Sequence, residues 1–321
     1  MRSPHLNSRS SALARCTAIA AAVAALFVTQ AQAANAAADA KPAAAAKAAG
    51  GPVLPKLSAE QIAERSVTAQ GGAGAWHAIQ SISYTGTLDA GKIRPDNGMN
   101  PASREVLLEK PGKPAKIAQA PESKPANLDG GTPVSLPYAM YMARPNKQRV
   151  EVKFQDETLV QVYDGKSGWK LQPYLKRGGA LPFTAEEMKK AQQFQEIDGL
   201  LVDYARKGTK LALDGTETVE GRPAYRLKLT LKSGEIQDIW IDARTFLDVK
   251  VEGVPHRMDG KIRKVYIVQH DFRTVQGLKV PYELVTTVEG YPDQHKMNLE
   301  QVQLNPILGD ELFTRPKAGK V

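Results

Sequence analysis

The side chains best suited to acid–base or metal chemistry are few in this chain and widely separated. Beyond the N-terminal segment the histidines are His77, His256, His270 and His295, and none has a neighbour at a spacing typical of metal ligands. No Gly-x-Ser-x-Gly nucleophile motif, Gly-x-x-x-x-Gly-Lys-Ser/Thr phosphate loop or His-Glu-x-x-His zinc motif occurs. We therefore expect no catalytic residues, metal or cofactor, and predict that the protein is not an enzyme.

Two carboxylate pairs are the remaining candidates for acid–base catalysis. Glu186 and Glu187 are adjacent at the expected start of a helix, where acidic side chains interact favourably with the helix dipole. Asp238 and Asp242 flank Trp240, and we interpret them as the solvated ends of a strand. Both pairs are thus better explained by structure than by catalysis.

Residues 1–33 have the pattern of a secretory signal peptide. Basic residues up to Arg15 precede an apolar run over 17–28 that is too short to span a membrane, and Ala31-Gln32-Ala33 is a small-residue cleavage site. We expect cleavage after Ala33, with cleavage after Ala36 or an uncleaved anchor as the alternatives.

Cys16 is the only cysteine of the chain. It follows Arg15 and precedes the apolar run, whereas a bacterial lipidation site has a small residue before its cysteine, at the end of that run. We therefore predict a protein that is not lipidated and whose mature chain has no disulfide. Together with the signal peptide, this predicts a periplasmic protein of a Gram-negative envelope.

Two further segments are predicted to lack regular structure. Residues 34–56 are mostly Ala, Lys, Pro and Gly, and we expect a disordered linker because so few large apolar side chains cannot offset the entropy of ordering. Residues 57–321 are predicted to form a single domain. Within it, residues 91–137 are rich in Pro, Lys and Gly and are predicted to be a long flexible insertion, either disordered or a flap.

The formal net charge of +9 is spread along the chain and is not gathered into one block. A solvated sheet face explains this distribution, and attraction to anionic lipid headgroups is the alternative. We predict no nucleic-acid partner.

Most of the domain consists of short alternating runs separated by glycine-containing turns such as Asp164-Gly165 and Gln276-Gly277. Tyr225, Leu227 and Leu229 alternate with polar residues, which is the period of two of a half-buried antiparallel strand. The sequence therefore predicts a mainly β fold with a few helices, built on one large antiparallel meander with an apolar face.

Two helices have clear start signals. A helix is predicted after Ser58, which forms a capping box with Gln61, and Gly71-Gly72 is expected to stop it. A second, strongly amphipathic helix is predicted over residues 184–204, where Thr184 and Glu187 form the capping box. Because this second helix interrupts the strands of one sheet, we expect it to cover the apolar face as a lid, over Leu227 and Leu229.

Several turn-and-strand segments between about residues 58 and 316 carry a resemblance to a known family. They are Arg144-Pro145-Asn146-Lys147-Gln148-Arg149-Val150-Glu151, Val162-Tyr163-Asp164-Gly165-Lys166-Ser167-Gly168-Trp169, Gly215-x-Glu217-x-Val219-Glu220-Gly221-Arg222-x-Ala224-Tyr225, Trp240-Ile241-Asp242 and Leu304-Asn305-Pro306. With these segments the chain resembles the LolA/LolB-like superfamily, in particular its longer branch of outer membrane lipoprotein-sorting proteins. The resemblance implies an unclosed β-barrel, or half-barrel, with an internal helix as a lid.

The function that the resemblance implies is that of a periplasmic carrier, which shelters the acyl chains of a lipid or lipoprotein in an apolar half-barrel cavity. Such a carrier takes part in outer membrane lipoprotein sorting, does not span the membrane, and has inner- and outer-membrane proteins as possible partners. The residues we expect to line the cavity and form its lid are Met188, Phe194, Ile197, Leu201, Tyr225, Leu227, Leu229 and Trp169. The alternatives are a periplasmic sensor or scaffold of the same fold that binds a protein partner, and a filled β-domain without a ligand.

Overall fold

The computed structural model describes residues 54–93, 132–154, 156–173, 179–193, 197–258, 261–292 and 294–317. The predicted signal peptide (1–33), the predicted linker up to residue 53, the centre of the predicted insertion (94–131) and Phe194 lie outside these residues.

Thirteen strands form one sheet in the order β6-β5-β4-β3-β2-β1-β15-β14-β13-β10-β9-β8-β7, and β11 pairs with β12 in a separate hairpin. The first half contains β1 (Ser81–Ile93), β2 (Thr132–Ala143), β3 (Lys147–Phe154), β4 (Glu157–Tyr163), β5 (Gly168–Leu171) and β6 (Leu181–Pro182). The second half and the hairpin contain β7 (Lys210–Val219), β8 (Arg222–Thr230), β9 (Ile236–Asp242), β10 (Asp248–Glu252), β11 (His256–Met258), β12 (Lys261–Arg263), β13 (Val265–Val275), β14 (Leu278–Val288) and β15 (Gln294–Leu304).

The order of the strands shows how the chain builds an open sheet. It starts in the centre with β1, moves outward by hairpins to β6, crosses to the opposite edge at β7, and returns by hairpins to β15 beside β1. The strand pairs of the sheet are antiparallel. The edge strands β6 and β7 are not neighbours, so the sheet does not close into a barrel. The predicted large, unclosed antiparallel sheet is therefore confirmed.

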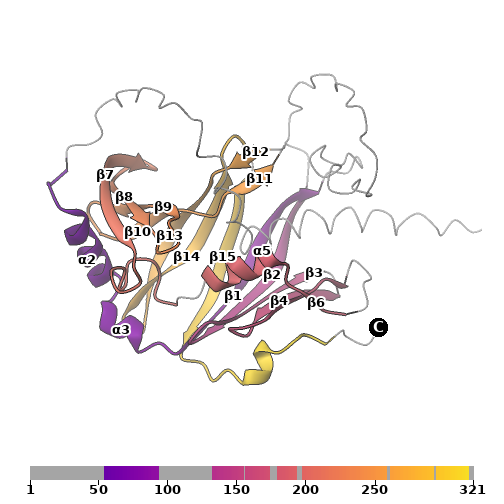
Figure 1. Cartoon of the computed structure of the whole chain (residues 1–321). Helices are drawn as coiled ribbons and strands as arrows, with labels where there is room; N and C mark the ends of the chain where they lie inside the picture. Colours follow the sequence, from indigo (N-terminus) through magenta and orange to yellow (C-terminus); the bar gives the residue numbers. More distant parts are fainter. Residues whose placement is uncertain are drawn as a thin grey trace, which may run out of the picture.

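Three α-helices and a short 3₁₀ helix are described: α2 (Ala59–Ala69), α3 (Ala73–His77), α5 (Ala185–Gln193) and η2 (Asp310–Phe313). Figure 1 shows α2 and α3 at the β7 side of the sheet and α5 within its curve. Both predicted capping boxes are present: Ser58 and Gln61 exchange hydrogen bonds at the start of α2, and Thr184 and Glu187 do so at the start of α5. Gly71, with φ of 115°, follows the end of α2 as predicted.

Two predicted boundaries are wrong. The helix expected over residues 184–204 does not reach Tyr204: α5 is described to Gln193, and residues 197–208 form consecutive turns. Gly199 and Asp203 have φ values of 74° and 52°, which are incompatible with a continuing right-handed helix. The expected insertion is also shorter at its ends, because β1 continues to Ile93 and β2 already starts at Thr132.

Register defines two faces of the sheet, since directly paired residues of neighbouring strands point to the same side. We call inner the face that carries Tyr84, Met140, Val150 and Gln161, which follow one another across β1 to β4. Tyr225, Leu227 and Leu229 of β8 lie on the same inner face at the other end, under α2. The opposite face, which carries Trp240 and Arg226, is called outer.

Candidate functional site

The described parts of the segment that crosses from β6 to β7, residues 183–193 and 197–209, lie over the inner face, where the lid was predicted. We call this segment the crossover segment. Its first part, α5, is attached to β5 by an ion pair between Lys170 Nζ and Glu187 Oε1 of 2.5 Å, and Ala191 of α5 lies against Tyr163 of β4. Its second part contributes Ile197 to the central core and Leu201 to the core under α2. Its described parts therefore contact the inner face near β4 and β5, in the central core and under α2.

A polar cluster fixes the middle of the crossover segment to the end of the sheet near α3. The Arg144 guanidinium donates to the carbonyl oxygens of Ile79 (2.7 Å) and Trp76 (3.2 Å) and forms an ion pair with the buried Asp198. His77 of α3 contacts the Asp203 carboxylate at 2.7 Å. Sequence reasoning singled out the segment beginning at Arg144 but not this role, because a contact between residues so far apart in sequence leaves no local pattern.

The end of the inner face near β7 is filled. Leu227 and Leu229 are 0 % exposed, and they pack with Ile62 of α2 and with Leu201 of the crossover segment. Tyr225, also predicted to line the cavity, is buried in the same cluster and donates a hydrogen bond to the Pro55 carbonyl. Of the stripe expected to cover Leu227 and Leu229, Leu201 packs in this cluster, and α2 covers the same face beside it.

The middle of the inner face is less completely covered. Large apolar side chains there remain half-buried, at the border of the central core: Tyr84, Met140, Met142, Phe154 and Leu284. Tyr84 pairs directly with Met140, so these two side chains are neighbours on β1 and β2. Tyr84 is half-buried, and burial raises the pKa of its hydroxyl. We call these five residues the open apolar patch.

The predicted lining residues are thus not gathered in one place. Met188 is half-buried on α5, whereas Ile197 and Leu201 belong to two different core clusters. Trp169 pairs with Val162 and packs with Val160, Leu171 and Ala180, which places it on the outer face and not in the interior. Phe194 lies outside the described residues. The members of the open apolar patch were missed, although Tyr84, Met140 and Met142 have the same alternation as the strands that were singled out.

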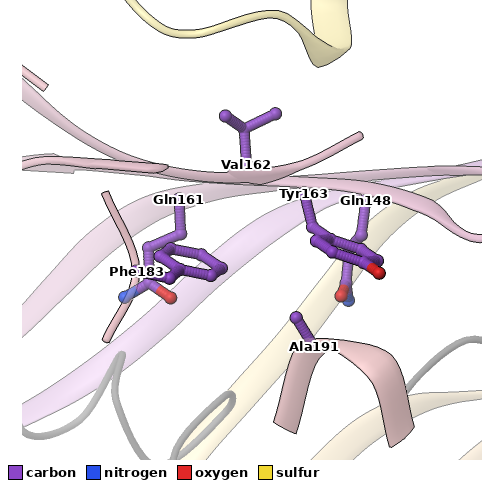
Figure 2. A pocket seen from close by; sticks show the side chains of 6 residues that line it. All are labelled: Gln148, Gln161, Val162, Tyr163, Phe183 and Ala191. Atoms are coloured by element: carbon purple, nitrogen blue, oxygen red, sulfur yellow. The ribbon is translucent and has the colours of Figure 1, made fainter. Parts of the chain in front are cut away.

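A small crevice borders the patch, between the sheet and α5. It is lined by Gln148, Gln161, Val162, Tyr163, Phe183 and Ala191 and is narrow. Figure 2 shows Gln148, Gln161, Tyr163 and Phe183 on the side of the sheet that faces Ala191, with Val162 pointing the other way. Phe183 packs directly on Gly168, where an added Cβ would stand 2.0 Å from its ring, so glycine is required at that position.

The two acidic pairs considered from sequence have structural roles. Glu187 caps α5 and pairs with Lys170. Asp238 and Asp242 are buried, so the expectation that they are solvated is wrong. Asp238 lies on the outer face in an ion pair with Arg226. Burial acts to raise the pKa of Asp242, but the hydrogen bonds that it accepts from the backbone of Thr245 and Arg244 hold this pKa below its usual range.

Within the ranges that the structure describes, no three His, Cys, Asp or Glu side chains are grouped as a metal site. Over the same residues, none of the helices has the length and apolar character needed to cross a membrane.

No family profile and no curated protein matches the chain. Solved structures align with the chain. A LolA superfamily protein from Nitrosomonas europaea aligns with a TM-score of 0.48 and 12% identity, over 81% of this chain and 99% of that one. A DUF1329 family protein from Desulfovibrio piger aligns with a TM-score of 0.47 and 11% identity, over 81% of this chain and 98% of that one.

A putative outer membrane lipoprotein-sorting protein domain from Vibrio parahaemolyticus aligns with a TM-score of 0.43 and 10% identity, over 79% of this chain and 95% of that one. The resemblance stated from sequence thus reappears among the structural neighbours. The chain is similar in fold to LolA superfamily proteins and to an outer membrane lipoprotein-sorting domain.

Proposed function

We propose that this protein is an exported, periplasmic carrier that shelters acyl chains of a lipid or lipoprotein against the open apolar patch. The observation that carries the proposal is the half-buried state of Tyr84, Met140 and Met142 in the middle of a face whose other end is sealed. Transfer of acyl CH₂ groups from water to such a surface is favourable by about 0.8 kcal/mol each.

The side chains of the patch suit a ligand of variable shape. Methionine is unbranched and polarizable, and it adapts to irregular apolar partners more easily than branched side chains do. Met140 and Met142 are neighbours on the inner face of β2, and Phe154 and Leu284 extend the apolar surface on both sides. A chain lying on these residues would cover apolar area that is now partly accessible.

The first part of the crossover segment supplies a means of access. α5 is attached to β5 by the ion pair between Lys170 and Glu187, whereas the second part of the segment places Ile197 and Leu201 in the core. An element held by few contacts opens at a lower free energy than one anchored in the core. Displacement of α5 would widen access to the patch while α2 and Leu201 keep the β7 end of the sheet closed.

The test is a binding measurement with detergent-free protein. Native mass spectrometry of protein purified from the periplasm would show a co-purified lipid as an added mass, and delipidated protein would bind a fluorescent fatty-acid analogue in a saturable titration. Absence of both would favour a filled β-domain. Capture of a protein partner without any lipid would favour the sensor or scaffold.

A further inference from the structure

The crevice beside α5 contains amide groups whose hydrogen-bonding capacity is not used. The Gln161 side chain has no hydrogen-bond partner among the described residues, and Figure 2 shows it beside Phe183 on the α5 side of the sheet. The Gln148 amide is buried, and its Nε2 contacts only the Met140 sulfur, at 3.6 Å. A thioether is a weak acceptor, so a stronger acceptor in the crevice would be favoured.

The dimensions of the crevice select a small polar group. It has room for about one water-sized group, which is too little for a fatty chain. The Phe183 ring and Ala191 provide apolar walls, and the Tyr163 hydroxyl already donates to the Gly165 carbonyl at 2.9 Å. The available donors in this site are therefore the two glutamine amides, which suit one carbonyl oxygen.

The crevice adjoins the open apolar patch through Gln148, because Val150, which lies between Gln161 and Met140, is fully buried. Gln148 pairs with Met142 of β2, and its Nε2 lies 3.6 Å from the Met140 sulfur. Met140 in turn pairs with Tyr84 of β1. The polar crevice and the apolar side chains of the patch are therefore neighbours on the inner face.

We propose that the Gln148–Gln161 crevice binds the carbonyl oxygen that joins an acyl chain to the rest of a lipid, with the chain lying over Met142 and Met140 toward Tyr84. The ligand class is thus an acyl ester or acyl amide, and a plain hydrocarbon or alkyl ether is discriminated against. This inference rests on the proposed carrier function and specifies its ligand. The amide NH₂ groups donate to the carbonyl oxygen, and no covalent step is involved.

The test uses two probes that differ only in the carbonyl group: monolauroylglycerol and its ether analogue, dodecylglycerol. Each is titrated into delipidated full-length mature protein, with displacement of a fluorescent fatty-acid analogue as the readout. The wild-type protein is expected to bind the ester about five- to tenfold more tightly than the ether, which is the contribution of one net hydrogen bond.

The variants are Gln161→Met and Gln148→Met, which keep side-chain length and remove the amide. Gln161 is half-buried, so its replacement is expected to leave folding intact even if the buried Gln148 position does not tolerate the change. Gln303→Met is the matched control, because Gln303 is an exposed residue of β15 that pairs with Ser83 away from the crevice.

Loss of the ester preference in Gln161→Met, with the preference retained in Gln303→Met, would support the carbonyl site. Equal binding of ester and ether by the wild type would overturn it and leave the carrier function standing, as would a preference that survives both crevice variants. Failure of every acyl probe to bind would overturn the carrier function and the carbonyl site together.

Discussion

The inner face of the sheet differs between its β7–β9 end and its β1–β3 middle. Both regions are built from strands with the same alternation of apolar and polar residues, and Leu227 and Met140 occupy equivalent alternating positions on their strands. At the β7–β9 end α2 and Leu201 cover the face, and Leu227 is 0 % exposed. In the middle the crossover segment covers it less completely, and Met140 stays half-buried.

The difference teaches that strand pattern sets the chemistry of a face, whereas the covering elements decide whether the face is a core or a surface available to a ligand. α2 is a regular helix that places Ile62 and Ala63 on the sheet. Residues 197–208 of the crossover segment are a series of turns, and they are tied down by ion pairs. A carrier needs both kinds of region: one to hold the fold and one to exchange contacts.

The largest expected effect is that of Leu229→Glu in the sealed region. A charge placed on this fully buried position without a partner should lower the free energy of unfolding by about 3–5 kcal/mol. Chemical denaturation measures the effect. Leu213→Glu is the control, since Leu213 of β7 is 41% exposed and the same change there should cost less than about 1 kcal/mol. Similar losses in the two variants would contradict a sealed β7–β9 end.

Met140→Gln should act on binding more than on folding. The side chain is half-buried, so the change should alter the free energy of unfolding by no more than about 1 kcal/mol. Loss of apolar contact with about two CH₂ groups should weaken acyl binding about tenfold. Fluorescent fatty-acid titration and denaturation curves on the same preparation separate the two effects. A variant that loses stability but binds normally would place Met140 in a closed core.

Asp248 should make the attachment of α2 dependent on pH. Its carboxylate accepts from Gln70 Nε2 at 3.0 Å and from Gln269 Nε2 at 3.3 Å, which joins the end of α2 to β10 and β13. Burial raises the pKa of Asp248 to about 6 from an ordinary value of 3.8. Because the folded state holds the proton more tightly, the contribution of this group to stability is greatest below pH 3.8 and falls as the pH rises to about 6.

Denaturation curves of the wild type and Asp248→Asn across this range would measure that contribution. The stability of the wild type relative to the variant should decline between about pH 4 and 6 and stay constant above it. A constant difference across the whole range would show that Asp248 does not titrate there.

The smallest expected effect is that of Ser58→Ala at the start of α2. The Ser58 hydroxyl accepts from the Gln61 backbone at 3.2 Å, and its loss should lower the free energy of unfolding by about 1 kcal/mol. Acyl binding should be unchanged, because α2 covers the sealed end. A loss of binding in this variant would mean that α2, and not the crossover segment, controls access.

The sequence predicted the strands well because each is bounded by a local signal, such as the turn at Asp164-Gly165. Residues 242–245 show how such signals work, with Asp242 Oδ1 accepting from the backbone of Arg244 and Thr245. The capping boxes of α2 and α5 were predicted for the same reason. The extension of α5 to Tyr204 was predicted wrongly, because the stripe of apolar residues continues past Gly199 and Asp203, which adopt positive φ.

The candidate site was predicted less well than the fold. Alternation shows that Tyr225 and Leu227 of β8 point to one face of the sheet and Arg226 to the other. It does not show which residues of the neighbouring strands share each face. Trp169 was assigned to the interior for that reason, and the register with Val162 places it outside. That α2 seals one end of the sheet also depends on contacts between distant parts of the chain, which no local pattern contains.

Photolabelling with a diazirine-bearing fatty acid tests the central claim most directly, because it reports where an acyl chain lies. After irradiation of delipidated protein and proteolysis, label is predicted on peptides carrying Tyr84, Met140 or Met142, and competition with unlabelled fatty acid should remove it. Label confined to β7–β9 peptides, or no competable label on β1 and β2, would contradict the assignment of the open apolar patch as the acyl-binding surface.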